Sequence, residues 1–95
     1  MYAIFVEVNA DESQTEAGRK FLNETAAPTA RERGAKAGFW LAPQNGRGVS
    51  VVAFETEDEA RTAASMFQVG QAPMPDAPQG VTVKTVEVRE VLASV

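Results

Sequence analysis

The segments of this chain that resemble β-strands carry apolar side chains on both faces. Alternate residues of a strand point to opposite faces of the sheet, so a sheet with one face in water shows apolar and polar residues in alternation. That alternation is missing in three segments, each of which has apolar residues on both faces. In the first, one face has Tyr2, Ile4, Val6 and Val8 and the other has Ala3 and Phe5; in the second, one face has Val49, Val51 and Ala53 and the other has Val52 and Phe54. In the third, one face has Val81 and Val83 and the other has Val86 and Val88. We therefore expect both faces of the sheet to be covered.

Four strands follow from the composition and the turn signals. They are expected over residues 2–8, 36–43, 49–55 and 81–91. The dipeptide Asn45-Gly46 stands between the second and third strands, and both of its residues tolerate a positive φ. The second and third strands are therefore predicted to form a tight hairpin.

Two helices are predicted between these strands. The first begins at a capping box from Ser13 to Glu16, is kinked or broken at Pro28, and stops at Gly34. The second begins at a capping box from Thr56 to Glu59 and ends at Gly70. Its face toward the sheet is rich in alanine, which lets a helix pack closely.

The order βαββαβ is that of the ferredoxin-like fold. Right-handed crossovers place both helices on one face of a four-stranded antiparallel sheet, so we expect an α+β fold with residues 1–95 in a single domain. The helices cover one face only. We therefore expect an obligate homodimer in which the bare faces of two sheets pack together. In the alternative, the proline-rich segment 71–80 covers the bare face within one chain.

The composition removes several classes of chemistry. The chain of 95 residues has no cysteine and no histidine, so it has no thiolate nucleophile and no histidine ligand for a metal or haem. We expect no metal and no cofactor. The net charge of −4 disfavours nucleic acid as a partner. No apolar run approaches the ~18 residues of a membrane span, and the apolar N-terminus lacks the features of a signal peptide, so we expect no membrane partner and a cytoplasmic location.

The sequence also resembles the dimeric α+β barrel superfamily, and within it the small antibiotic-biosynthesis-monooxygenase-like proteins. The likeness covers nearly the whole chain and includes "GF" at the start of the hairpin and the stretch "GRGVSVVAFETEDEA". The residues that carry it are Pro28, Gly38, Phe39, Gly48, Val51, Phe54, Glu55, Thr56, Glu59 and Ala60. The resemblance implies a homodimer whose sheets form a barrel, and a cavity between the sheet and the helices of each subunit.

The resemblance leaves the activity open. The family includes cofactor-free oxygenases of polycyclic aromatics, haem-degrading oxygenases, isomerases and proteins without an assigned activity. The haem-degrading members use a histidine ligand, which this chain lacks. We expect a homodimeric protein that binds a small apolar or aromatic molecule between sheet and helices. The alternative is a cofactor-independent monooxygenase acting on a phenolic or quinonoid substrate, and an isomerase or decarboxylase is a third possibility. No catalytic motif decides whether the chain is an enzyme.

Six residues are candidates for the wall of such a pocket. They are Asn9, Phe21, Trp40, Phe54, Met66 and Phe67. The aromatic and methionine side chains would give an adaptable apolar lining, to which the indole N–H of Trp40 adds a donor. Oxygenase members of the family are thought to use an asparagine and a tryptophan, which is why Asn9 is included. Each of the six has an alternative role in core packing or, for Asn9, in a turn.

The remaining candidates are polar or lie in the last loop. Glu7 and Glu55 are either solvated strand ends or, if buried beside aromatic rings, candidate bases, with Tyr2 as another group able to transfer a proton. The segment 70–80 is either a lid or a connector. Four basic residues form either a small anion site or ordinary helix-end and turn charges: Arg31, Arg33, Lys36 and Arg47. Phe39 and Trp40 should point to opposite faces of the sheet, one toward the helices and one toward the dimer partner.

Overall fold

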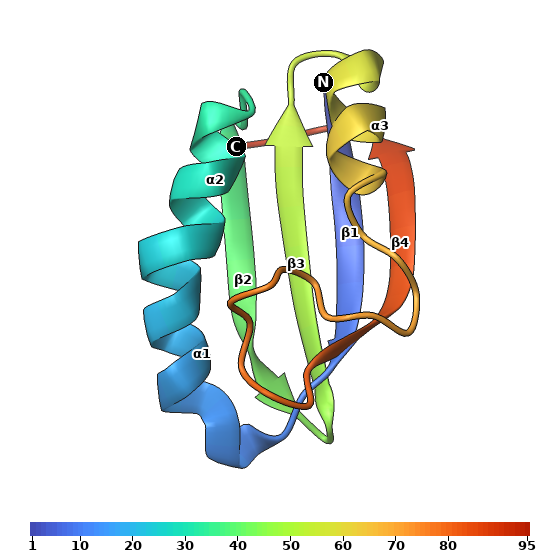
Figure 1. The fold of residues 1–95 in the computed structure, drawn as a ribbon. Helices are drawn as coiled ribbons and strands as arrows, with labels where there is room; N and C mark the ends of the chain where they lie inside the picture. Colours follow the sequence, from blue (N-terminus) through green and yellow to red (C-terminus); the bar gives the residue numbers. More distant parts are fainter.

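A computed structural model describes residues 1–95 and has an α+β fold: a four-stranded antiparallel sheet with its helices on one face (Figure 1). The strands are β1 (Tyr2–Asn9), β2 (Ala37–Gln44), β3 (Arg47–Phe54) and β4 (Thr82–Glu90). They are arranged in the order β2-β3-β1-β4. This arrangement is consistent with the ferredoxin-like fold that the sequence predicts.

The hairpin between β2 and β3 is confirmed. Asn45 and Gly46 have φ values of 56° and 76°, so both turn residues adopt the left-handed conformation that a two-residue hairpin needs. The amide N–H of Asn45 donates to the Glu12 carboxylate over 2.9 Å. The tip of the hairpin is thus tied to the start of the first helix.

Residues 12–32 form one continuous helical segment, here called the long helix. It consists of the 3₁₀ turn η1 (Glu12–Gln14), α1 (Thr15–Phe21), the π-helical turn η2 (Leu22–Ala26) and α2 (Ala27–Glu32). The predicted capping box at Ser13 is wrong by two residues. Asp11 is the cap: its carboxylate accepts from the Ser13 N–H over 2.9 Å, and Gln14 completes the box. Aspartate and glutamine fulfil the same capping role as the predicted serine and glutamate.

The sequence predicts a kink or a break at Pro28, and the structure shows no break, because the helical segment continues through a local irregularity. Proline cannot donate to the carbonyl four residues earlier, and its ring needs space there. The chain meets this requirement with the π-helical turn η2, in which the Ala27 N–H donates to the Leu22 carbonyl five residues back. The wider turn accommodates Pro28 in the first turn of α2, and the helix continues to Glu32.

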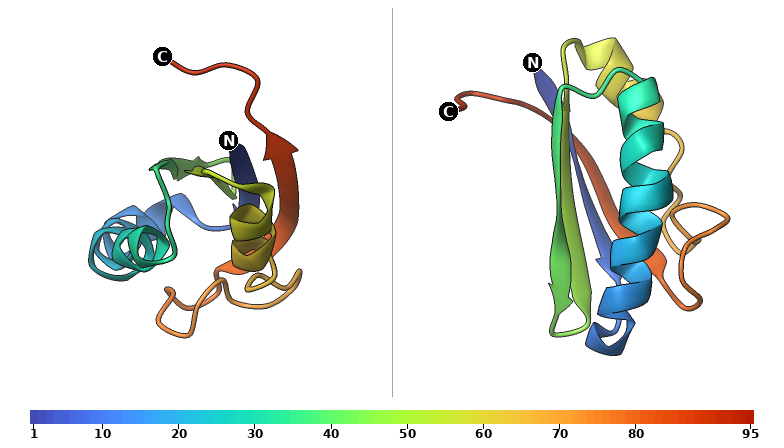
Figure 2. Two further views of the ribbon diagram at one scale, coloured as in Figure 1. Left: turned by 90° about the horizontal axis from the view of Figure 1, so that it is seen from above. Right: turned by 90° about the vertical axis from the view of Figure 1, so that its left-hand side faces the viewer.

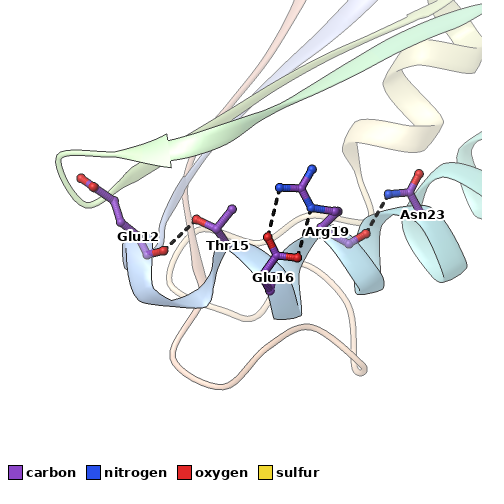
Figure 3. Close-up of polar contacts among 5 residues, drawn as sticks. All are labelled: Glu12, Thr15, Glu16, Arg19 and Asn23. Atoms are coloured by element: carbon purple, nitrogen blue, oxygen red, sulfur yellow. Dashed lines mark hydrogen bonds and ion pairs between the residues drawn. The ribbon is translucent and has the colours of Figure 1, made fainter.

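A stripe of polar side chains joins successive turns at the start of the long helix (Figure 3). The Thr15 hydroxyl donates to the Glu12 carbonyl over 2.7 Å, Arg19 pairs with Glu16 at 3.2 Å, and the Asn23 amide donates to the Arg19 carbonyl over 2.9 Å. Glu16, Arg19 and Asn23 are exposed, so this stripe faces solvent. A neighbouring stripe of Phe21, Leu22 and Ala26 is half-buried and faces the sheet.

The second helix, α3 (Glu57–Ala64), begins where the sequence predicts. Thr56 accepts from the Glu59 N–H over 3.2 Å, and the Glu59 side chain bonds back to the Thr56 backbone. Its end differs from the prediction, because the helix stops at Ala64 and not at Gly70. The Ser65 hydroxyl donates to the Thr62 carbonyl over 2.6 Å, a local bond that competes with helix continuation.

The last strand places its valines differently from the prediction. A bulge shifts the register so that Glu7 faces Thr85 while Val8 faces Val83. The extra residue brings Val83 onto the same face as Val86 and Val88, which lie opposite Val6 and Ile4. All three valines pack on the side of the helices, and the other side of β4 presents Thr85, Glu87 and Arg89. The prediction that β4 is apolar on both faces is therefore wrong.

The core lies between α3 and the sheet. It consists of Ile4, Val6, Val52, Phe54, Ala60, Ala63 and Val83. Residues 65–81, here called the proline-rich loop, lie on the same side of the sheet as the helices (Figure 2). The alternative in which this loop covers the bare face is thus not observed. The opposite side, here called the open face, carries no other element over its strands, and Phe39 there is 69% exposed.

Candidate functional site

A cavity of about 350 Å³ lies between the long helix, the sheet and the proline-rich loop. It is lined by 29 residues, of which 18 are hydrophobic. Only two lining residues are charged, Asp11 and Arg33, and three more have polar uncharged side chains, Gln14, Thr29 and Ser50. A cavity of this size and composition is suited to a small, mostly apolar molecule.

The cavity exists because the two helices pack at different distances from the sheet. In α3, Ala60 is fully buried and Ala63 is 5% exposed, so this helix touches the strands closely. None of the residues of the long helix is buried, which leaves space between it and the strands β2 and β3. Small residues on both walls keep this space open. A Cβ atom on Gly18 would meet nothing within 4 Å.

Trp40 forms part of the floor of the cavity. It lies on β2, directly opposite Ser50 of β3, which in turn lies opposite Val6 of β1. The six-membered ring of the indole folds back over Gly38, where an added Cβ would come within 3.2 Å of it. A glycine at position 38 therefore gives the tryptophan space to lie against the sheet.

Five of the six predicted pocket residues line this cavity. They are Phe21 on the long helix, Trp40 and Phe54 on the sheet, and Met66 and Phe67 after α3. Phe54 is 1% exposed and belongs to the core, whereas Met66 is 51% exposed and lies at the rim. The phenyl rings, the indole and the thioether thus meet around one space, although they come from three separate parts of the chain.

Asn9 lies outside the cavity. Its amide donates to the Thr82 hydroxyl over 3.2 Å, which links the ends of β1 and β4. Odd-numbered residues of β1 point away from the helices, as the pairing of Phe5 with Val51 and of Ile4 with Val52 indicates. Asn9 borders a separate, shallow and polar hollow at the strand ends. It therefore cannot contact a molecule bound beside Trp40.

The predicted base candidates also lie elsewhere. Glu55 is exposed and sits 3.8 Å from Lys36. Glu7 is on the open face, where its side chain is 12% exposed and is paired with Arg47 and Lys84. The hydrogen bond from Arg47 lowers the pKa of Glu7, and burial acts in the opposite direction. The hydrogen bond from Thr85 and the charge of Lys84 lower this pKa further. Glu7 is therefore held ionised, which does not suit a base that must take up a proton.

The four basic residues do not form one anion site. Arg47 pairs with Glu7 and Lys36 with Glu55. Arg33 lines the cavity at the C-terminal end of the long helix. No group of three or more acidic, cysteine or histidine side chains is placed to hold a metal ion.

The proline-rich loop closes one side of the cavity. Pro73, Met74 and Pro75 are among its lining residues. The loop is attached to the long helix by the Gln14 amide, which donates to the Gln79 carbonyl over 2.6 Å. It is attached to the sheet by a bond from the Gly70 N–H to the Val83 carbonyl, 2.8 Å long. The loop therefore forms a wall of the cavity and is more than a connector between α3 and β4.

Among the lining residues that the sequence did not indicate, Ser50 and Gly18 matter most for the size and polarity of the cavity. Ser50 shares its face of β3 with Val52 and Phe54, so a hydroxyl interrupts an apolar face in the middle of a central strand. A serine at this position of an apolar strand face is the sequence signal that could have indicated a polar group in the cavity. Gly18 stands inside a helix, where glycine is unfavourable unless space is needed. Both signals were visible in the sequence, but each is weak without knowledge of the neighbouring elements.

Comparison with protein-family models, with curated proteins and with solved structures finds no match to this chain. The resemblance to the dimeric α+β barrel superfamily therefore stays a prediction, while the α+β fold itself is compatible with it. None of the helices combines the length and the apolar character needed to cross a membrane.

Proposed function

We propose that this chain is a ligand-binding protein that holds a small apolar or aromatic molecule in the cavity between the long helix and the sheet. The observation that carries the proposal is the cavity itself, about 350 Å³ in volume and mostly apolar in its lining. A chain of this size buries only a small apolar core, so each apolar surface that stays unburied reduces its stability. A helix that stands away from its sheet leaves apolar surface unburied, and a bound molecule would compensate for that loss.

Binding is preferred to oxygenase chemistry because a single carboxylate lines the cavity, and that carboxylate serves as the cap of the long helix. Asp11 is the acidic residue in its lining, and its carboxylate is occupied as the cap of the long helix. Glu7 and Glu55 are outside the lining, and so is Tyr2. An oxygenase of the cofactor-independent kind would need a group here that removes a proton from its substrate. The monooxygenase alternative therefore has no specific support among the lining residues.

We also propose that two copies pack through their open faces, as in the dimeric α+β barrel superfamily that the sequence resembles. Phe39, Val51 and Phe5 are direct neighbours across β2, β3 and β1, which makes one apolar row on this face. Phe39 is 69% and Val51 42% exposed, and Leu41 beside them is 60% exposed. A contiguous apolar patch of this kind is typical of an interface. A second copy is the natural occupant, because it brings an identical apolar sheet face.

The binding proposal can be tested with the protein's own fluorescence. Trp40 is the single tryptophan of the chain and lines the cavity. Titration with 2-acetylnaphthalene should change the Trp40 emission saturably, with one molecule bound per chain. Isothermal titration calorimetry should give the same stoichiometry. A signal that rises linearly without saturation would show partition onto exposed apolar surface and would contradict the proposal.

A further inference from the structure

We propose that Ser50 is the residue that selects the ligand, by donating a hydrogen bond to an oxygen acceptor on an otherwise apolar ring system. This inference rests on the proposed ligand binding. It adds the chemical class of the ligand: an aromatic ketone or a related molecule with one carbonyl oxygen near the centre of the cavity, as opposed to a hydrocarbon.

The position of Ser50 in the sheet supports this role. Ser50 lies on β3, one of the two central strands, with Val6 on one side and Trp40 on the other. All three residues line the cavity. Along β3 the same face carries Val52 and Phe54. The floor is therefore apolar except for the Ser50 hydroxyl, which lies in its middle, and the indole N–H of the neighbouring Trp40.

The hydroxyl of Ser50 is also free to bind. The side-chain hydrogen bonds of the chain include none from Ser50, and none from the indole N–H of Trp40. Every fully buried polar side-chain atom of the chain has a hydrogen-bond partner. Since the Ser50 hydroxyl has none, it is not fully buried, and a molecule in the cavity can reach it. In the empty protein this group can be satisfied by solvent.

Other polar groups of the lining are less suited to the task. Asp11 accepts the Ser13 N–H, and Gln14 donates to the Gln79 carbonyl. Thr29 and Arg33 belong to the C-terminal part of the long helix, on the wall that faces the floor. On the floor, the hydroxyl group is that of Ser50. It lies beside the indole ring of Trp40, against which an aromatic ring of the ligand can stack.

Selectivity follows from desolvation. A ligand that fills the cavity removes the Ser50 hydroxyl from water. A carbonyl oxygen restores the lost hydrogen bond, whereas a hydrocarbon of the same shape leaves the hydroxyl unpaired. The protein should therefore prefer the ketone to its hydrocarbon analogue, and the preference should depend on the hydroxyl at position 50.

The test compares two probes of similar shape, 2-acetylnaphthalene and 2-isopropylnaphthalene, on the wild-type chain and on Ser50→Ala and Ser50→Thr. Ser50→Ala should weaken binding of the ketone about three- to tenfold, the value of one hydrogen bond, and should leave binding of the hydrocarbon unchanged or slightly tighter. Ser50→Thr keeps a hydroxyl and fits a strand, so it should retain the preference for the ketone. Circular dichroism and thermal unfolding establish that each variant is folded.

The outcomes separate this inference from the proposal beneath it. If both probes bind the wild type and Ser50→Ala changes their affinities by the same factor, the role of Ser50 is overturned while ligand binding stands. The same holds if the wild type does not prefer the ketone. If neither probe binds the wild type saturably, both the ligand-binding proposal and the inference about Ser50 are overturned.

Discussion

Glu7 shows how a single carboxylate is held ionised on a largely apolar sheet face. It lies at the end of the apolar open face, within reach of Arg47 and Lys84, and it accepts a hydrogen bond from Thr85 over 3.2 Å. Its side chain is 12% exposed, so an unpaired charge here would be unfavourable. The three partners compensate for this, and together they link β1, β3 and β4 at their ends.

We predict that Glu7→Gln lowers stability at neutral pH and that this difference disappears in acid. The pKa of Glu7 in the folded chain is below its ordinary value of 4.5, chiefly because Arg47 donates a hydrogen bond to it. A lowered folded pKa means that the stabilisation is fully present above the unfolded pKa and is lost as the pH falls through the folded pKa. The difference between wild type and Glu7→Gln should therefore be constant above about pH 5 and should shrink toward pH 3.

Urea unfolding of both chains at a series of pH values measures this difference. The matched control is Glu16→Gln, which removes an exposed carboxylate paired with Arg19 at 3.2 Å. Exposed pairs of this kind contribute about 0–1 kcal/mol. A Glu7→Gln effect that is as large at pH 3 as at pH 7 would show that the substitution acts through packing and not through the charge.

At the scale of elements, the long helix and the cavity depend on the same residue. Gly18 lies in α1, faces the cavity, and has no atom within 4 Å of where a Cβ would be. Glycine inside a helix costs about 1 kcal/mol relative to alanine. The chain thus has a less stable helix at a position where a larger side chain would fill the cavity.

We predict that Gly18→Leu increases stability and weakens ligand binding. The gain in stability should be about 0.5–1 kcal/mol from helix propensity. The leucine side chain would occupy space that the probe needs, and loss of contacts to two or more buried carbon atoms should weaken binding of 2-acetylnaphthalene at least about tenfold. Thermal unfolding and calorimetric titration measure the two effects.

Two controls make this prediction specific. Gly18→Ala should stabilise by about 1 kcal/mol with a small effect on binding, because one methyl group takes little of the cavity. Ala17→Leu adds the same side chain at an exposed neighbouring position that does not line the cavity. It should leave binding unchanged. Unimpaired binding by Gly18→Leu would mean that the probe occupies another site, such as the open face.

The elements also show which parts of the structure the sequence could predict. Turn and cap signals are local, so the Asn45-Gly46 hairpin and the Thr56 cap were predicted correctly. The bulge in β4 was not, because it depends on how Val8 and Val83 pair across two distant segments. For Pro28 the sequence left a kink or a break open, and it could not specify the π-helical turn by which the helix accommodates the proline without breaking.

The candidate site was predictable only in part, because local sequence signals identify residue types but not how distant elements pack. Aromatic residues in an apolar element, such as Phe21 and Trp40, can be recognised from the sequence as candidates for the lining of a pocket. Whether they surround a cavity or fill a core depends on the distance of the long helix from the sheet, which no local pattern encodes. Alternation along β1 puts Asn9 on the same face as Phe5, but only the packing of Ile4 and Val6 in the core shows that this face points away from the helices.

At the scale of the whole molecule, the two sides of the sheet have different occupants. The helices and the proline-rich loop lie on one side, and the C-terminal residues 91–95 leave β4 toward the other (Figure 2). On the open face the apolar area lies over β2, β3 and β1, while β4 contributes charged and polar residues such as Glu87 and Arg89. The apolar area therefore has a polar border, as protein interfaces commonly do.

The last prediction concerns this interface: Phe39→Glu should convert a dimer to a monomer without unfolding the chain. Phe39 is 69% exposed in one chain and lies on the open face, away from the cavity. In a twofold-symmetric dimer the substitution enters the interface twice. Loss of an aromatic residue from the apolar row costs about 2 kcal/mol in each of the two copies, so the dissociation constant should rise by roughly three orders of magnitude.

Sedimentation velocity over a concentration series, with circular dichroism on the same samples, measures this change. Val69→Glu is the matched control, because Val69 is 67% exposed in the proline-rich loop on the opposite side of the sheet. It should remain dimeric. Since the cavity and the open face lie on opposite sides, Phe39→Glu should also retain binding of 2-acetylnaphthalene within about twofold. A wild-type chain that sediments as a monomer throughout the series would contradict the dimer, and the exposed row of Phe39, Val51 and Phe5 would then require a different partner.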